Sequence, residues 1–168
     1  MYKKLTYRDI TWIDLESPKP DELKDLAKEY NLHPLVVSEL ASPSLRSKVD
    51  IYGDFIYLVL LFPFCQVCYG ESKPSERDYQ EIDFIIGRNF LITTHYELVN
   101  PLNDFAKILE TDLNFRKTEQ PLHAGFLFYY IIKEIYASLE ESLNFVNRRL
   151  KEVEKKVFSS EERNVVET

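Results

Sequence analysis

Glycine, cysteine and long hydrophobic runs are scarce in this chain. Four glycines in 168 residues leave little room for the glycine-rich loop that holds phosphates in nucleotide-binding proteins. The longest apolar run, Phe55 to Cys65, contains Pro63 and is far shorter than the roughly 20 residues of a membrane-spanning helix. No secretory signal pattern opens the chain. We therefore expect a soluble chain on the cytoplasmic side, without a nucleotide-binding loop.

The two cysteines, Cys65 and Cys68, form a single C-x-x-C pair. A structural zinc site needs four ligands, and the sequence places neither a second cysteine pair nor a histidine close by. A redox dithiol usually begins a helix that follows a strand, a context that is missing around these residues. The pair is therefore predicted to be two reduced thiols near the end of a strand.

Basic residues are outnumbered, with 21 Lys and Arg against 28 Asp and Glu and a net charge of −7. Most of the imbalance lies in residues 1–120, which hold 14 basic and 20 acidic side chains. An acidic surface repels the phosphates of nucleic acid and of anionic lipid, but it attracts cations. We therefore expect cations, and no nucleic acid, as partners of this chain.

The segment from Pro121 to Phe158 has the pattern of one long helix. Proline suits the first helical turn, and a single glycine follows it. Such a helix is roughly 57 Å long, whereas a domain of this size is only about 40 Å across. The helix is therefore predicted to extend beyond its own domain. Apolar residues recur along it every three or four positions: Phe128, Ile132, Ile135, Leu139, Leu143, Val146, Leu150, Val153 and Val157.

The two halves of this helix differ in composition. From Phe126 to Leu139 nearly every face is apolar or aromatic, which predicts burial. From Glu140 onward only a narrow stripe is apolar, as at the seam of a coiled coil. A solvated, frayed helix end is the alternative, and we favour protrusion of the stripe into an oligomer or against a second segment. The chain is accordingly divided into an α+β domain (residues 1–120) and a stalk helix (residues 121–168) whose C-terminal half protrudes.

The remaining pattern predicts six strands and three shorter helices. Neighbouring strands are mostly joined by short turns, which favours antiparallel pairing. The continuous run FIYLVLLF (Phe55–Phe62) predicts a strand with both faces covered. We therefore expect an α+β fold, a three-layer α-β-α sandwich with a largely antiparallel mixed sheet and a long C-terminal stalk helix. Asn31 is predicted to end the first of the shorter helices in the left-handed conformation that asparagine tolerates. Strands are expected near Lys4–Tyr7, Ile10–Leu15, Val49–Ile51, Phe55–Phe62, Glu81–Gly87 and Phe90–Glu97, and helices near Asp21–Tyr30, Pro34–Leu40 and Asn100–Leu113.

Of the three histidines, only His95 suggests catalysis. It follows a buried-looking strand and has Thr93, Thr94 and Glu97 nearby, a set that suits a general base. No serine or cysteine nucleophile can be identified, however, and most histidines in such a place are simply hydrogen-bonded at the rim of a sheet. We therefore predict that the chain is not an enzyme.

Carboxylates are the remaining candidates for cation ligands. They do not form the dense loop motif of a closed calcium site, which takes about six or more oxygen ligands. A pair completed across a subunit boundary would leave no such motif. Most of them are predicted to be solvated surface acids. The set comprises Asp14, Glu16, Glu39, Asp78, Glu81 and Asp83.

Five stretches, in order, resemble the cytoplasmic domain of the CorA-type magnesium and cobalt transporters. They are TWIDLESP (Thr11–Pro18), HPLVVSEL (His33–Leu40), Arg46–Asp50, EIDFIIGRNFLITTHYE (Glu81–Glu97) and the long helix. The resemblance covers nearly all of the chain. It implies the regulatory domain of a homopentameric divalent-cation channel in the cell membrane, whose stalk helices run toward two C-terminal membrane-spanning helices. Members of the family move Mg²⁺, Co²⁺, Ni²⁺ or Zn²⁺.

The family's regulatory metal site is altered here. Relatives carry a Glu-Asp pair after His-Pro-Leu, which matches Ser38 and Glu39, and a further acid on the long helix, which matches Lys133. The resemblance thus implies Glu39 as the remaining ligand for regulatory Mg²⁺ or Co²⁺ between subunits. Ser38 and Lys133 weaken that site. We hypothesise that Lys133 pairs with Glu39 of a neighbouring subunit in place of the ion.

Two other functions stay open at the level of the sequence. One is a stand-alone soluble module that self-associates through the long helix and binds a small ligand. The other is a hydrolase centred on His95. The transported ion cannot be read from this chain, because the resemblance places ion selection in a pore outside it.

Overall fold

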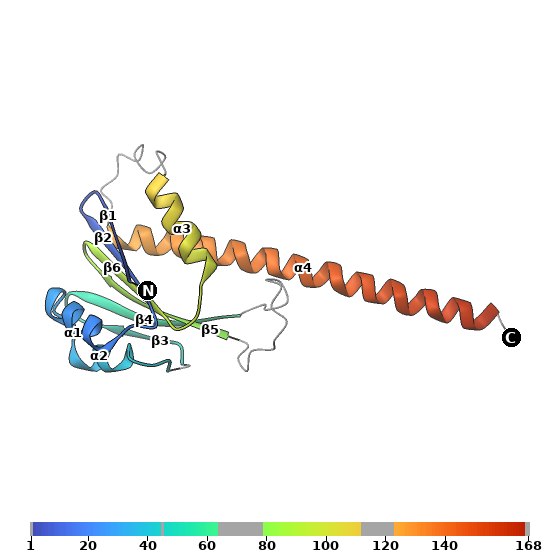
Figure 1. Ribbon diagram of the computed structural model, residues 1–168, viewed down its shortest axis with the longest axis horizontal. Helices are drawn as coiled ribbons and strands as arrows, with labels where there is room; N and C mark the ends of the chain where they lie inside the picture. The colour runs from blue at the N-terminus through green and yellow to red at the C-terminus, as the bar shows by residue number, and fades with distance from the viewer. Residues whose placement is uncertain (1, 45, 64–78, 112–122, 167–168) are drawn as a thin grey trace.

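The computed structural model describes residues 2–44, 46–63, 79–111 and 123–166, and its elements follow the predicted order (Figure 1). Cys65, Cys68, Asp78 and Pro121 lie outside the described residues. The strands are β1 (Tyr2–Tyr7), β2 (Ile10–Glu16), β3 (Lys48–Ile51), β4 (Phe55–Pro63), β5 (Tyr79–Gly87) and β6 (Phe90–His95). The helices are α1 (Pro20–Glu29), α2 (Pro34–Glu39), α3 (Asn100–Thr111) and α4 (Ala124–Val166).

One sheet holds the six described strands, in the order β1-β2-β6-β5-β4-β3. Among them only β2 and β6 pair in parallel, and every other neighbouring pair is antiparallel. The predicted mixed, largely antiparallel sheet is confirmed. The parallel pair joins two segments far apart in the sequence and places Asp14 beside Thr93 and Glu16 beside His95.

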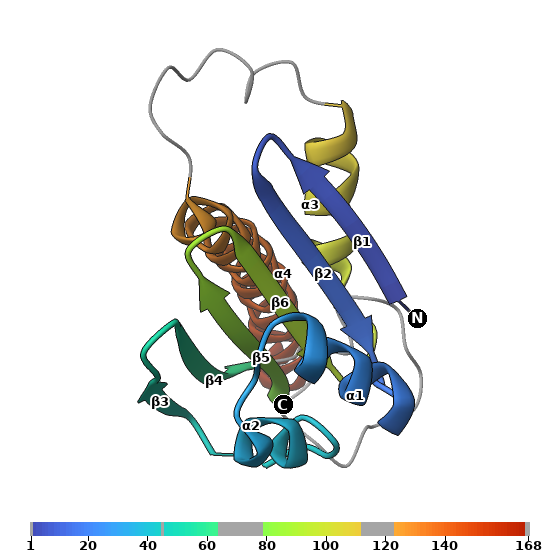
Figure 2. The ribbon, with the colours of Figure 1, turned by 90° about the vertical axis from the view of Figure 1, so that its left-hand side faces the viewer.

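Helices cover both faces of this sheet, so the three-layer prediction is confirmed (Figure 2). α1 and α2 pack on one face through a core that includes Leu26 and Val36. α3 and α4 pack on the other face through a core that includes Phe105 and Ile131. Side chains alternate between the two cores along each strand, because successive residues of a strand point to opposite faces.

β4 is covered less completely than its apolar run predicts. Tyr57 and Val59 are buried in the α1–α2 core, as expected. On the opposite face Leu58 and Leu60 are only partly buried, and Ile56 is 38% exposed. The prediction of two fully covered faces is therefore wrong for the second face, because α4 packs mainly on β2, β5 and β6 and leaves this edge of the sheet open.

Local chemistry sets several boundaries of these elements. Asn31 has a φ of 50° after α1, the left-handed conformation predicted for it. His33 precedes α2, and its Nδ1 accepts a hydrogen bond from the Leu35 backbone N–H at 3.2 Å. Gly87 ends β5 where any Cβ would overlap the ring of Phe90. The hairpin between β5 and β6 thus needs glycine for lack of space.

The first part of α4 is buried on one side only. Its core-facing residues are Ala124, Leu127, Ile131 and Ile135, whereas Tyr129 and Tyr136 are 59% and 63% exposed. The prediction that nearly every face between Phe126 and Leu139 is buried is therefore wrong. The sheet contacts one side of a helix, and no other described element lies against the opposite side.

Leu139 is the last residue along α4 that packs against a core, and the outer part of the helix extends away from the other described elements (Figure 1). The 43 residues of α4 span about 65 Å at 1.5 Å per residue. The stripe residues of this outer half belong to neither core and are 48–61% exposed: Leu143, Val146, Leu150, Val153 and Val157. Their role in self-association stays a prediction.

Candidate functional site

α2 positions the two residues that match the family's regulatory pair, Ser38 and Glu39. This six-residue helix has Pro34 in its first turn. The Ser38 hydroxyl donates to the carbonyl oxygen of Leu35 at 2.7 Å, so it is turned back onto its own helix. Glu39 ends the helix, and its carboxylate forms an ion pair with Lys48 at the start of β3.

Lys48 supplies Glu39 with a cation from the same chain. Its ammonium group also pairs with Asp50 Oδ2 at 3.0 Å and lies 4.8 Å from the centre of the Tyr57 ring. Burial by itself would lower the pKa of Lys48, but the hydrogen bonds to the two carboxylates outweigh it and raise that pKa. Glu39 therefore already has a cationic partner within its own chain, which it shares with Asp50.

Lys133 lies on the exposed side of α4, in the layer opposite α2. The sheet separates it from Glu39, so the fold of one chain does not bring these two residues together (Figure 2). In the part of the chain that the structure describes, no group of three or more His, Cys, Asp or Glu could hold a metal ion. The Glu39 site and its pairing with Lys133 of a neighbour stay predictions about an assembly.

Three of the six candidate acids are buried, although most of the six were predicted to be solvated. Asp14, Glu81 and Asp83 are 8%, 6% and 1% exposed. Glu81 and Asp83 precede Ile85 on β5 by an even number of positions, so they share the face on which Ile85 is buried. This period of two in the sequence was the signal for their burial.

The carboxyl group of Asp83 is hydrogen-bonded through only one of its two oxygens among the described residues. Its Oδ2 accepts hydrogen bonds from Thr94 at 2.9 Å and from Tyr96 at 3.3 Å. Its Oδ1 is buried without a hydrogen-bond partner among the described residues. Burial raises the pKa of Asp83 to about 7; the bond from Thr94 opposes this rise, and the charge of Glu81 adds to it. Asp83 thus titrates near neutral pH inside the domain.

A second buried network joins β2 to β6 on the opposite face of the sheet. Trp12 Nε1 donates to Thr93 Oγ1 at 3.0 Å, and Thr93 donates to Asp14 Oδ1 at 2.6 Å. His95 Nε2 lies 3.4 Å from the same Asp14 oxygen, and Nδ1 lies 2.6 Å from the Glu97 carbonyl oxygen. Nδ1 must carry a proton, because a carbonyl oxygen only accepts. The network therefore ties the two parallel strands together.

The state of His95 follows from these contacts. Burial lowers the pKa of its imidazole, but the Asp14 carboxylate, 3.4 Å from Nε2, outweighs that effect and raises the pKa overall. His95 and Asp14 thus form a buried contact, which is an ion pair when the imidazole is protonated. His95 is also 2% exposed, which leaves a substrate no path to its ring. The arrangement is that of a structural histidine at a sheet rim.

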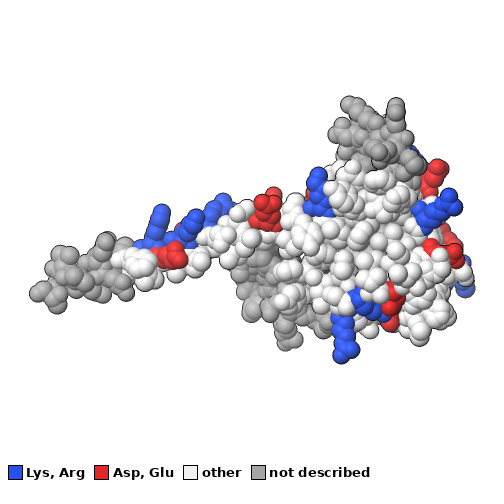
Figure 3. Space-filling view, turned by 180° about the vertical axis from the view of Figure 1, so that it is seen from behind, with Lys and Arg blue, Asp and Glu red and all other residues white. Residues whose placement is uncertain are grey.

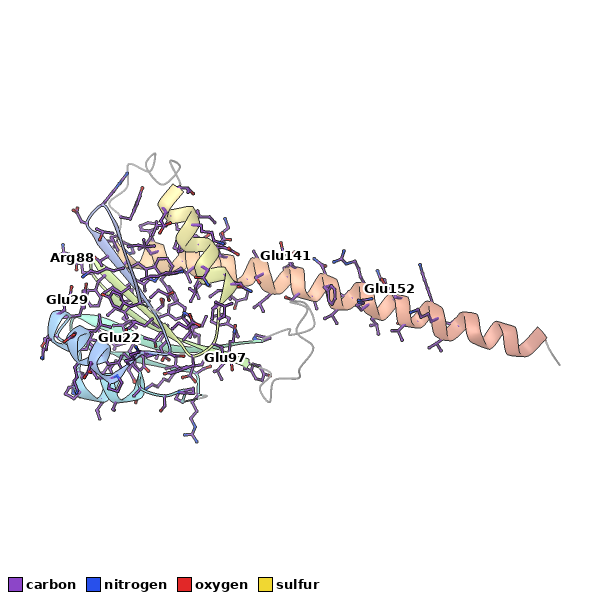
Figure 4. The ribbon with its side chains drawn as sticks, in the orientation of Figure 1. Glu22, Glu29, Arg88, Glu97, Glu141 and Glu152 are labelled. Carbon is purple, nitrogen blue, oxygen red and sulfur yellow. The ribbon has the colours of Figure 1, made fainter. Side chains whose placement is uncertain are left out.

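Charged side chains outside these clusters are spread over the surface. Glu22 and Glu29 lie on α1, Glu97 follows β6, and Glu141 and Glu152 lie along α4 beyond the body (Figure 4). Lys and Arg side chains follow one edge of the outer half of α4 on the face drawn in Figure 3. Among the described residues, the group of Glu39, Lys48 and Asp50 is thus the one that contains the predicted regulatory ligand.

Comparison of the sequence with known proteins identifies its relatives. Residues 7–168 match the family model described as CorA-like Mg²⁺ transporter protein. The cobalt/magnesium transport protein CorA of Methanocaldococcus jannaschii is 26% identical over 162 residues, which are 94% of this chain and 47% of that protein. The magnesium transporter ALR2 of Saccharomyces cerevisiae is 21% identical over 149 residues, 88% of this chain and 16% of that protein. The chain therefore spans less than half the length of either relative.

Solved structures share the fold. The soluble domain of CorA from Methanocaldococcus jannaschii matches with a TM-score of 0.66 at 23% identity, over 90% of this chain and 56% of that one. The cytoplasmic domain of ZntB from Vibrio parahaemolyticus matches with a TM-score of 0.63 at 16% identity, over 87% of this chain and 55% of that one.

None of the described helices is long and apolar enough to cross a membrane. On the match over residues 7–168, the chain belongs to the CorA-like Mg²⁺ transporter family.

Proposed function

We propose that this chain is the cytoplasmic regulatory domain of a divalent-cation transporter of the cell membrane, which carries Mg²⁺ and also Co²⁺. The family match over residues 7–168 is the observation that supports it most. The long helix leaving an α+β body is consistent with the same role. The membrane part is proposed to lie outside the described residues, whose helices include no membrane span.

α4 is proposed to couple this domain to the rest of the transporter. Its first part is held in the body by Leu127 and Ile131, and its outer half carries the exposed apolar stripe. Removing such side chains from water stabilises an assembly by about 25 cal/mol per Å² of apolar surface. We propose that the stripes pack together in a homo-oligomer, a pentamer in the full-length protein. The division into residues 1–120 and 121–168 is proposed because α4 is one continuous helix whose outer half leaves the body.

Glu39 is proposed to be a weak regulatory ligand for Mg²⁺ or Co²⁺ at a subunit boundary. Lys48 already pairs with it, Ser38 brings no charge, and Lys133 from a neighbour would add a second ammonium group. Hard divalent ions need several oxygen ligands and favour anionic ones. We therefore expect weaker regulatory binding than at an intact pair of carboxylates.

Transport is tested with the full gene that encodes this chain, expressed in a bacterial strain that grows only in high Mg²⁺. We expect growth to be restored at low Mg²⁺, and Co²⁺ to enter the cells. The control is the variant Lys107→Gln, which changes an exposed residue of α3 outside both cores. It should behave like the unsubstituted protein. Protein present in the membrane without either effect would contradict the proposal. Full-length protein found only in the soluble fraction, without either effect, would contradict it as well and would favour the stand-alone, ligand-binding oligomer.

Self-association is tested with the isolated chain. Light scattering should show an oligomer that Leu150→Glu dissociates, because the substitution places a charge in the apolar stripe. Asn147→Glu introduces the same charge on the same exposed turn but outside the stripe, and it should leave the oligomer intact. A monomeric chain, or equal effects of the two variants, would contradict packing through the stripe.

Regulatory binding is tested by calorimetric titration of the oligomer with Mg²⁺ or Co²⁺. We expect weak heats that disappear in Glu39→Ala and persist in Glu110→Ala, which removes an exposed acid of α3. Tight binding that depends on Glu39 would contradict the weak site. It would also contradict the replacement of the ion by Lys133.

A further inference from the structure

The buried carboxyl group of Asp83 takes no part in the proposed transport function. It lies in the middle of β5, beside Val59 of β4 and Thr94 of β6. It points toward the α1–α2 layer and is 1% exposed. Carboxylic side chains are rarely buried this deeply unless they are paired, and one oxygen of this one has no partner among the described residues.

Titratable and hydroxyl groups face Asp83 from several elements. Tyr57 and Tyr96 stay neutral at physiological pH, since burial and the charge of Asp83 both raise their pKa values. The described cation of this region, Lys48, is engaged by Glu39 and Asp50. The groups are Thr94 and Tyr96 at the end of β6, Glu81 on β5, Tyr57 on β4, Glu39 at the end of α2, and Lys48 with Asp50 on β3.

The segment that follows α2 closes one side of this cluster. The backbone N–H of Ser44 donates to Glu81 Oε1 at 2.8 Å, and the Ser44 hydroxyl lies 3.4 and 3.3 Å from the two Glu81 oxygens. Glu81 and Asp83 point to the same face of β5. Glu39, at the C-terminal end of α2, is close enough for its charge to raise the pKa of Asp83. Ser44 thus contacts Glu81 directly, and Leu40 at the end of α2 is buried in the same core as Val59, the β4 neighbour of Asp83.

The protonation state of Asp83 decides how costly its burial is. A neutral Asp83 is a small polar group that accepts two hydroxyl hydrogen bonds. An ionised Asp83 is a buried anion beside Glu81, with Oδ1 lacking a donor. Burying such an anion is costly unless water or a cation reaches it. The sheet fixes the strands of this cluster. Ser44 and the end of α2 are therefore the parts that are free to move.

We propose that protonation of Asp83 controls how firmly the end of α2 is held on the sheet, and we call this arrangement the latch. With its proton, Asp83 keeps α2 and Ser44 seated on β5. Without its proton, it loosens them so that water reaches the carboxylate. The latch would give this domain a response to pH near neutrality, and it does not depend on the proposed transport function.

Hydrogen exchange of the whole chain between pH 6 and pH 8.5 tests the latch. After correction for the chemical exchange rate, we expect protection of the amides in residues 36–44 to fall about tenfold, the effect of one pKa unit. Protection in residues 127–135 of α4 serves as the internal reference and should change less. A parallel loss in both segments would mean general destabilisation and would overturn the latch. Constant protection of residues 36–44 would overturn it as well.

Asp83→Asn keeps the shape of the side chain but cannot ionise. In this variant the protection of residues 36–44 should not depend on pH. Asp54→Asn, in the exposed turn between β3 and β4, should behave like the unsubstituted chain. A pH response that persists in Asp83→Asn would overturn the latch.

A direct titration keeps the proposal testable if Asp83→Asn does not fold. The carboxyl carbon of Asp83, followed by NMR in the unsubstituted chain, should titrate with a midpoint near 7. A midpoint below about 5, closer to an ordinary aspartate, would overturn the proposal. So would a midpoint near 7 that is unaccompanied by any change in the amide signals of α2 and Ser44.

Discussion

The body of the molecule and the outer half of α4 place the same kinds of side chain in opposite surroundings. Leu127 is fully buried, whereas Leu150, on the same helix, is 55% exposed. Asp83 is buried beside two hydroxyl groups, whereas Glu152 lies on the surface and pairs with Arg149 at 3.1 Å. Packing and desolvation therefore govern the stability of the body. The outer half adds little to the folding of one chain and is available for association.

The largest expected contrast is between two leucines of α4. Leu127→Ala should lower the free energy of unfolding by about 3 kcal/mol, because it removes buried methyl groups and leaves a cavity. Leu150→Ala should lower it by less than about 0.5 kcal/mol in the monomer, since the side chain is already exposed. Urea unfolding at a concentration where the chain is monomeric measures both. Equal losses in the free energy of unfolding would contradict the contrast between the body and the outer half of α4.

The next contrast is between two acids and depends on pH. Burial raises the pKa of Asp83 from 3.8 to about 7, so its contribution to stability is full below pH 4 and is lost as pH rises to about 7. Asp83→Asn should therefore be more stable than the unsubstituted chain at pH 8 by about 2 kcal/mol, within the limit of about 4 kcal/mol set by the shift. The two proteins should unfold alike near pH 4. Glu152→Gln, on the outer half of α4, should show no such change between the two pH values.

The smallest contrast is between two ion pairs. Lys48→Met leaves Glu39 and Asp50 without their shared cation and should cost about 1 kcal/mol, a figure reduced by the partial exposure of all three side chains. Arg149→Met breaks a pair that is more than half exposed on both sides and should cost about 0.3 kcal/mol. Chemical unfolding at low salt measures both. If Arg149→Met cost more than Lys48→Met, partial burial would not be what distinguishes the two pairs.

Much of the fold could be predicted from periodicity and turn chemistry. The order of strands and helices, the mixed antiparallel sheet and the left-handed Asn31 were all predicted and confirmed. These features depend on neighbouring residues, or on one repeating face, and such signals are contained within a short window of sequence. The parallel pairing of β2 with β6 depends on distant segments, and no local pattern specified it.

The candidate site was harder to predict because it depends on which charges meet. Glu39 was identified through its resemblance to a family motif, but its partner Lys48 was not, although only a short segment separates them. Glu81 and Asp83 belong to a set of six acids most of which were predicted to be solvated. The strand period that places them beside Ile85 outweighed that preference. Hydroxyl groups from β6 and the backbone of Ser44 make their burial tolerable, and these partners are visible only in three dimensions.

α4 separates what the sequence determined from what the tertiary structure decided. The sequence by itself determined a long helix with one continuous apolar stripe, because the spacing of its residues is a local property of the chain. The tertiary structure decided where burial of that stripe ends, near Leu139, since that boundary is the edge of the sheet. It also left Tyr129 and Tyr136 on the open side of the helix. The stripe itself does not change at Leu139, but the surface available to cover it does.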